Sequence, residues 1–190
     1  MGGTFDPIHN GHLMMAERAL GQCELDEVWF MPSHLPPHKD ARQLTEAEDR
    51  LEMVRLAIRE YDVFRLCMLE IERGGTSYTI DTARQLVKQY PEYQFSWIIG
   101  ADMIAYLPNW FQIDELMKLI SFIGVRRPGY ELQLAELSDT YAARVRMIDA
   151  PLLDISSTGI RKRLQTGQSV QQLISEPIES YIREKGLYGA

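Results

Sequence analysis

The sequence predicts an α/β protein with a Rossmann-like, doubly wound, mostly parallel sheet and helices on both faces. Short apolar runs rich in β-branched and aromatic residues alternate with amphipathic stretches, and this alternation is typical of βαβ units. The composition agrees, because 190 residues with 45% hydrophobic and 25% charged residues are ordinary for a globular domain. We therefore expect a single domain over residues 1–190, with a small helical portion at its C-terminal end.

The order of elements follows from the spacing of apolar residues. The runs predicted as strands are 28–32, 64–71, 95–100, 121–127 and 144–149. The stretches predicted as helices are 12–22, 45–61, 77–90, 112–120, 160–167 and 169–186, the last interrupted by Pro177. The letters TEAE from Thr45 to Glu48 predict a capping box at the start of the second helix.

Charge and cysteine content exclude several classes of function. The net charge of −7 argues against nucleic acid or an acidic membrane as partner. No run of about 18 apolar residues and no signal-peptide pattern is seen, so we expect a cytoplasmic protein without membrane contact. Cys23 and Cys67 form no pair motif, which predicts two reduced thiols. An anionic ligand must therefore be held by a local cluster of donors.

The opening stretch GGTFDPIHNGH has the features of a phosphate site. Gly2 and Gly3 allow a tight turn and a close approach of ligand to backbone. His9 and His12 lie one turn apart where a helix is expected to begin, and the free N–H groups and dipole at a helix start favour phosphate. Gly11 between the two histidines keeps the approach open. The motif therefore suits a phosphate chain bound close to the backbone.

A second candidate anion site lies in ISSTGIR, residues 155–161. Three successive hydroxyl side chains precede Arg161 at the start of a predicted helix, and any of them is suited to the N-cap position: Ser156, Ser157 and Thr158. Exposed N–H groups, hydroxyls and a guanidinium together suit the β- and γ-phosphates of a nucleotide. We expect Lys162 and Arg163 to be solvated residues.

Two simpler interpretations of the opening stretch are a structural glycine turn and a zinc site. The four histidines of the chain are His9, His12, His34 and His38. They lack a Cys pair or an HExxH helix, which zinc sites normally have. Zinc is therefore the weaker interpretation.

The two motifs resemble the signatures of the nucleotidyltransferase superfamily that has an HxGH motif and an ISSTxxR motif. Within it, the chain is similar to the bacterial nicotinate-nucleotide adenylyltransferase family. Further matching segments are PPHK (36–39), SYTIDT (77–82), IIGADM (98–103), LPNW (107–110), RPG (127–129) and YIREKGLY (181–188). The resemblance covers almost the whole chain in the expected order. It implies transfer of AMP from ATP to nicotinate mononucleotide, giving nicotinate adenine dinucleotide and pyrophosphate, in NAD biosynthesis.

The resemblance also implies roles for individual residues. The implied ATP-binding residues are Gly2, Gly3, Thr4, Phe5, His9, His12, Gly100, Asp102, Ser156, Ser157, Thr158 and Arg161. The implied nicotinate mononucleotide-binding residues are Lys39, Ser77, Tyr78, Thr79, Trp110, Phe111 and Arg127. The implied catalytic residues are His9, His12, Lys39 and Arg161. Mg²⁺ is expected to bridge the ATP phosphates, with few protein ligands.

One departure from the family pattern concerns the N-terminal end. Family members carry a short apolar strand before GGTFDP, whereas Met1 directly precedes Gly2 here, so that strand is expected to be absent. Without that strand, the two strands that would flank it have unpaired backbone N–H and C=O groups along their facing edges. Two explanations for the missing strand compete. The sequence starts at an internal methionine, or tag residues that precede Met1 take the place of the strand.

Other functions share parts of these motifs. Class I aminoacyl-tRNA synthetases also use HxGH, but this chain lacks a KMSK-type loop and a tRNA-binding extension. Phosphopantetheine adenylyltransferase and glycerol-phosphate cytidylyltransferase belong to the same superfamily, but LPNW and SYTIDT favour a pyridine nucleotide. A non-catalytic nucleotide sensor and a zinc-stabilised interaction module are alternatives from other classes. The sequence leaves a homo-oligomer open, and we expect the loops 33–43 and 103–111 to close over substrates.

Overall fold

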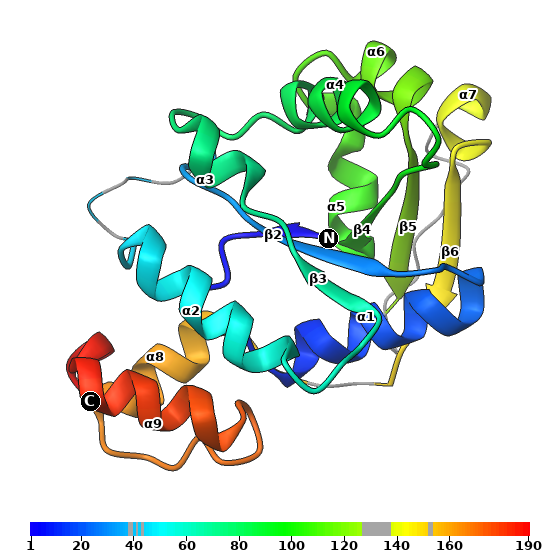
Figure 1. Ribbon diagram of the computed structural model, residues 1–190. Coiled ribbons are helices and arrows are strands. Elements are labelled where there is room, and N and C mark those ends of the chain that lie inside the picture. The colour runs from blue at the N-terminus through cyan, green and yellow to red at the C-terminus, as the bar shows by residue number, and fades with distance from the viewer. Residues whose placement is uncertain (38–39, 41, 43, 127–137, 152–153) are drawn as a thin grey trace.

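The structure, a computed structural model, describes residues 1–37, 40, 42, 44–126, 138–151 and 154–190. Its described strands form two parallel three-stranded sheets, in the orders β1-β2-β3 and β4-β5-β6 (Figure 1). The strands are β1 (Gly2–Gly3), β2 (Val28–Pro32), β3 (Phe64–Leu66), β4 (Ser96–Gly100), β5 (Ser121–Arg126) and β6 (Val145–Asp149). All the pairings within these sheets are parallel, so the predicted α/β class is confirmed.

Helices cover both faces of these strands. The α-helices are α1 (Asn10–Cys23), α2 (Ala47–Ile58), α3 (Leu69–Arg73), α4 (Thr79–Gln89), α5 (Ala101–Tyr106), α6 (Ile113–Leu119), α7 (Asp139–Ala142), α8 (Ser157–Gln165) and α9 (Glu176–Lys185), with 3₁₀ turns η2 (Leu107–Asn109) and η4 (Leu187–Gly189). Successive residues of β4 point to opposite faces, as strand geometry requires. Ile98 packs in one hydrophobic cluster with residues of α1 and α2, whereas Trp97 and Ile99 pack in another with residues of α4, α5 and α6.

The N-terminal strand β1 is short and is the edge strand of the first sheet that faces β4 of the second sheet. The sequence predicts only a turn at Gly2 and Gly3, but these residues pair with Met31 and Pro32 of β2. The Met31 N–H also donates to the Met1 carbonyl at 3.0 Å. β1 contacts β4 on its other side, although the described residues form no ladder there. The chain therefore enters its candidate phosphate loop directly from a partly buried strand.

The predicted strand 64–71 is wrong in its second half. β3 ends at Leu66, and Leu69–Arg73 forms α3, which buries Leu69 and Glu70. A short apolar run cannot be assigned to strand or helix by its period alone. Gly74, with φ of 69°, ends the helix, because glycine adopts positive φ without steric cost.

Two helix starts also differ from the prediction. α9 begins at Glu176, with Pro177 in its first turn, where a missing N–H is tolerated; the stretch 169–186 is therefore not one helix. The capping box at Thr45 is wrong, since α2 begins at Ala47 after Glu46 and has no side-chain cap.

The predicted C-terminal helical portion is confirmed. α8, α9 and η4 lie together at the lower left of Figure 1, beside α2. Ile160, Leu164, Ile178 and Ile182 are buried in the same cluster as Met53 of α2. In the part of the chain that the structure describes, no helix is both long and apolar enough to cross a bilayer.

Candidate functional site

Two adjoining cavities open at the carboxyl ends of the parallel strands. One has a volume of about 310 Å³ and the other of about 670 Å³, and Thr4 lines both. Thr4 follows β1, Ser33 follows β2 and Ala150 follows β6, and each of these residues lines at least one of the cavities. Doubly wound sheets bind ligands at this edge. We name them the smaller cavity and the larger cavity.

The paired histidines lie at the start of α1 and line the smaller cavity. His9 is the N-cap residue, and its backbone N–H donates to His12 Nδ1 at 3.2 Å. The two rings stack with centroids 3.7 Å apart and planes 22° apart. Because Nδ1 of His12 accepts a hydrogen bond, the neutral ring carries its proton on Nε2, which makes that nitrogen a donor. The structure therefore places His9 at the N-cap and His12 on the first turn of α1, one helical turn apart as the sequence predicts.

Close packing holds these rings in place. A Cβ at Gly11 would lie 3.0 Å from His9 Nδ1, so only glycine leaves the ring undisturbed here. Phe5 meets the His12 ring edge-on, with centroids 5.0 Å apart. The Phe5 side chain is 2% exposed and does not line either cavity. The Phe5 side chain therefore supports the His12 ring, and the ATP contact that the resemblance implies for Phe5 stays a prediction.

The second motif meets the first across the smaller cavity. Ser156 is the N-cap of α8, and its Oγ accepts from the Gly159 N–H at 3.1 Å. Ser157 Oγ donates to the Pro7 carbonyl at 2.9 Å. Arg161 lines the cavity and donates from Nη2 to Thr158 Oγ1 at 3.4 Å. The structure thus brings the two candidate anion sites together, with imidazole, hydroxyl and guanidinium groups around one space.

The larger cavity has a polar end and an aromatic wall. Ser77, Tyr78 and Thr79 line it at the start of α4, where N–H groups and the helix dipole favour an anion. Trp110 and Phe111 form the other wall, and Phe111 is 54% exposed. The arrangement suits a planar ring that carries a negative substituent.

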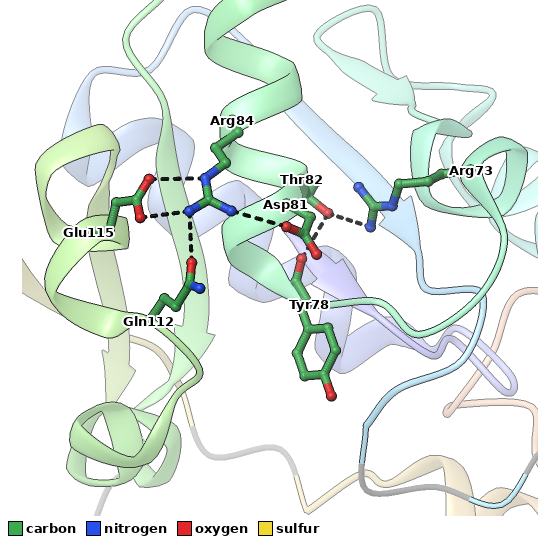
Figure 2. A network of polar contacts seen from close by, with 7 residues as sticks. All are labelled: Arg73, Tyr78, Asp81, Thr82, Arg84, Gln112 and Glu115. Atoms are coloured by element: carbon green, nitrogen blue, oxygen red, sulfur yellow. Dashed lines mark hydrogen bonds and ion pairs between the residues drawn. The ribbon is translucent and has the colours of Figure 1, made fainter.

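An ion-pair network holds these two walls together (Figure 2). Arg84 of α4 donates to both carboxylate oxygens of Glu115, at 2.9 and 2.6 Å, and to Gln112 at 2.7 Å. It also contacts Asp81 at 3.3 Å. Since Gln112 directly follows Phe111, the network links the first turn of α4 to the aromatic wall.

Glu70 of α3 is a buried carboxyl at the larger cavity. It lines the cavity, is only 4% exposed and accepts a hydrogen bond from Thr82 Oγ1 at 2.7 Å. Arg73 donates to the same Thr82 hydroxyl at 2.9 Å, as Figure 2 shows. Burial raises the pKa of Glu70 above its ordinary value of 4.5, against the opposing effect of hydrogen bonds from Thr82 and Ser77.

Glu70→Gln is expected to change the pH dependence of stability. A raised pKa means that the folded protein binds more protons than the unfolded chain between pH 4.5 and the folded pKa. Wild type should therefore lose stability relative to Glu70→Gln as the pH rises through the folded pKa, by at most about 1.4 kcal/mol per pH unit. Urea unfolding from pH 4 to 8 measures this difference. Glu72→Gln, an exposed change on the same helix, is the control, and a pH-independent difference for Glu70→Gln would contradict the expectation.

Among the described residues, the implied site residues that do not line either cavity are Phe5, Gly100 and Asp102. Lys39 and Arg127 lie outside the described residues. Gly100 ends β4 and Asp102 lies in the first turn of α5, close to the larger cavity but not lining it. A Cβ at Gly100 would lie 2.6 Å from Asp102 Oδ1, so the carboxylate folds back over the glycine.

Several residues that organise the site were not identified from the sequence as functional. They are Asp6, Arg50, Glu70 and Tyr188. The burial of Arg50 could have been predicted from the sequence, because Arg50 shares the apolar face of its helix with Met53, Val54 and Ala57 at helical spacing. Asp6 and Tyr188 lie in segments that resemble the family, but their contact spans 182 positions of the chain, so the motifs do not show it. Glu70 contacts Thr82 of the next helix, and nothing in the letters around it indicates this.

Residues 1–163 match the family described as Cytidylyltransferase-like. The chain belongs to the cytidylyltransferase-like family. Within this family, it is 48% identical over 189 residues to a Geobacillus kaustophilus protein named "Probable nicotinate-nucleotide adenylyltransferase", covering 100% of this chain and 84% of the relative. It is 46% identical over 187 residues to the nicotinate-nucleotide adenylyltransferase of Bacillus subtilis, covering 98% of this chain and 95% of the relative. The family predicted from the two motifs is thereby confirmed.

A solved structure supports the fold of this family member. The Plasmodium falciparum nicotinic acid mononucleotide adenylyltransferase, complexed with NaAD, superposes with a TM-score of 0.83 at 24% identity. The match covers 99% of this chain and 95% of the Plasmodium chain. At this identity the likeness concerns the fold, and it agrees with the predicted Rossmann-like class.

Proposed function

We propose that this protein transfers AMP from ATP to nicotinate mononucleotide, releasing pyrophosphate and forming nicotinate adenine dinucleotide for NAD biosynthesis. The observation that carries the proposal is the junction of two cavities at Thr4, one lined by phosphate-binding groups and the other by aromatic residues and a helix N-terminus. The names and high identity of the curated relatives support the same reaction.

The reaction requires positioning more than acid–base chemistry. An oxygen of the 5′-phosphate of nicotinate mononucleotide attacks the α-phosphorus of ATP, and the bond from that phosphorus to the oxygen bridging to the β-phosphate breaks. Pyrophosphate leaves with the electron pair of that bond. Because the attacking oxygen is already anionic, no general base is needed, and catalysis comes from alignment and charge stabilisation.

The smaller cavity is suited to the phosphates of ATP. His9, His12 and Arg161 line it and would stabilise the negative charge on the α-phosphate and on the leaving pyrophosphate. Hydroxyls of Ser156 and Thr158 lie at the same wall. We keep Lys39 as a further cation for these phosphates on the strength of the family resemblance alone.

The larger cavity is suited to the nicotinate end of the acceptor. The start of α4 at Thr79 would receive the pyridine carboxylate through N–H groups and the Thr79 hydroxyl. Trp110 would stack on the pyridine ring, and its own edge-on contact with Phe122, with centroids 5.9 Å apart, holds the indole in place. Arg127 is kept here as a further candidate from the resemblance.

Mg²⁺ is proposed as the cofactor, held by ATP phosphates and water. Hydroxyls, two imidazoles and the Arg161 guanidinium make up most of the polar lining of the smaller cavity, and Asp6 Oδ1 there accepts the Tyr188 hydroxyl at 2.6 Å. Among the described residues, no three His, Cys, Asp or Glu side chains are grouped to hold a metal ion. This donor set fits magnesium, which keeps several waters and is often bound through substrate phosphates. Bound there, the ion would neutralise phosphate charge.

We also propose the cytoplasm as the compartment and small nucleotides as the partners. Cys23 and Cys67 are not joined in a disulfide, which fits a reducing environment. The net charge of −7 is unfavourable for nucleic acid.

Pyrophosphate release with ATP and Mg²⁺ tests the proposed function. Nicotinate mononucleotide should support rapid release, nicotinamide mononucleotide much slower release, and ATP without acceptor none. Equal use of the two acceptors would overturn the carboxylate assignment at Thr79 while leaving the reaction class. ATP binding without release with either acceptor would favour a nucleotide sensor instead.

A further inference from the structure

We propose that Tyr188, near the C-terminal end of the chain, is a positioning residue for the transfer reaction, acting through Asp6 on the cavity-lining Arg161. The inference rests on the proposed function for its kinetic consequence. Tyr188 lies beyond residue 163, where the match to the family model ends, and within YIREKGLY, a segment that resembles the relatives.

Asp6 connects the C-terminal turn to the phosphate loop. It lines the smaller cavity but is only 3% exposed. Its carboxylate accepts the Tyr188 hydroxyl at 2.6 Å through Oδ1 and the Thr45 N–H at 3.4 Å through Oδ2. Its backbone carbonyl accepts a hydrogen bond from Arg161 Nη1 at 2.8 Å. One residue is therefore bonded to Tyr188 by its side chain and to Arg161 by its backbone.

Arg161 depends on Asp6 for its orientation. The hydrogen bond to the Asp6 carbonyl, at 2.8 Å, is much shorter than the 3.4 Å contact with Thr158. The guanidinium has further N–H donors for phosphate. A neutral carbonyl holds the group without neutralising its charge, so Arg161 remains able to interact with an anion in the cavity.

Tyr188 is held for this contact in an unusual backbone conformation. Its φ of 59° is in the left-handed region, which non-glycine residues adopt rarely and retain only where their surroundings enforce it. Burial, followed by the charge of Asp6, raises the pKa of the phenol far above its ordinary value of 10. The hydroxyl therefore keeps its proton and donates to Asp6 throughout the physiological pH range.

Loss of the hydroxyl would free a carboxylate next to a cation. Without the 2.6 Å bond from Tyr188, Asp6 Oδ1 loses its short donor, and buried carboxylates need a partner. The nearby Arg161, whose charge Tyr188 senses, could satisfy it. The guanidinium would then be neutralised by Asp6 and drawn away from the phosphates.

Tyr188→Phe tests the tether, with Tyr181→Phe as the matched control. Tyr181 donates its hydroxyl to Asp49 at 2.7 Å, joining α9 to α2, and neither residue lines the smaller or larger cavity. Tyr188→Phe should lower kcat by roughly tenfold to a hundredfold, as small misplacements of catalytic groups do, and leave the KM for nicotinate mononucleotide unchanged. Tyr181→Phe should keep wild-type kinetics, although urea unfolding should show a comparable loss of stability. Equal kcat for the two variants would reduce Tyr188 to a structural tether and overturn the proposal.

A double-mutant cycle identifies the route of the effect. If Tyr188 acts through Arg161, Tyr188→Phe should have little further effect on kcat in an Arg161→Ala background. The same fold-loss in both backgrounds would contradict that route.

ATP binding, measured by calorimetry, separates this inference from the proposed function. Tyr188→Phe should weaken ATP binding relative to Tyr181→Phe, whether or not the protein releases pyrophosphate. Weaker binding together with no pyrophosphate release would refute the proposed function and leave the tether standing. Equal ATP dissociation constants for the two variants would count against the tether.

Discussion

His12→Ala is expected to lower kcat by roughly 10²- to 10³-fold while the KM for ATP changes little. The imidazole lines the smaller cavity, where negative charge on the α-phosphate and leaving group grows in the transition state. A donor that interacts most strongly at that stage contributes to kcat rather than to substrate binding. Steady-state pyrophosphate release at varied ATP measures both constants.

His34→Ala is the matched control for this change. The His34 ring bonds to the Gly75 carbonyl at 2.9 Å and does not line either cavity, so its removal should leave kcat near wild type. A near-normal kcat for His12→Ala would show that His12 does not stabilise the transition state. A rise in KM with unchanged kcat would assign His12 to ground-state binding instead.

Arg50→Met should lower the free energy of unfolding by about 3–5 kcal/mol, the usual range when a buried charged partner is removed. Arg50 is only 2% exposed and joins three segments of the site by hydrogen bonds to backbone carbonyls. These are the carbonyls of Thr45 at 2.9 Å, Thr4 at 3.0 Å, Ser33 at 2.7 Å and His34 at 3.3 Å. Methionine fills similar space but leaves these acceptors without a donor, and each such buried group is costly.

Urea unfolding midpoints of Arg50→Met and Arg55→Met test this expectation. Arg55 lies on the same helix, pairs with Glu52 and has a side chain that is 56% exposed. Its replacement should cost no more than about 1 kcal/mol. Similar midpoints for the two variants would mean that the buried hydrogen bonds of Arg50 contribute little. Because Thr4 borders both cavities, pyrophosphate release should also fall in Arg50→Met and not in Arg55→Met.

Features with local physical causes were predictable from the sequence. The close approach of His9 and His12 follows from helical spacing, and Ser156 was among the three hydroxyl residues expected at the N-cap of α8. The alternation of apolar runs and amphipathic stretches was enough for the α/β class, since each element buries one face or stripe. The family was recognisable because its two motifs occur in order within one chain.

Segments whose residues are compatible with more than one kind of secondary structure were predicted less well. The run from 64 to 71 was compatible with a strand or a short helix, and only its packing selected α3 for Leu69–Arg73. α9 spans only Glu176–Lys185 of the predicted stretch 169–186, because the residues before it form turns. In both places tertiary contacts outweighed weak local propensity.

The sequence by itself determined the fold class, the family and the two anion-binding motifs, because these depend on periodicity and on residues close together in the chain. Only the tertiary structure decided which groups hold those motifs in place. Arg50 binds backbone carbonyls, which every residue has, so no pattern of letters identifies its partners. The Tyr188 hydroxyl reaches Asp6 across 182 positions of the chain, and such a contact exists only after the C-terminal helices have packed beside α2.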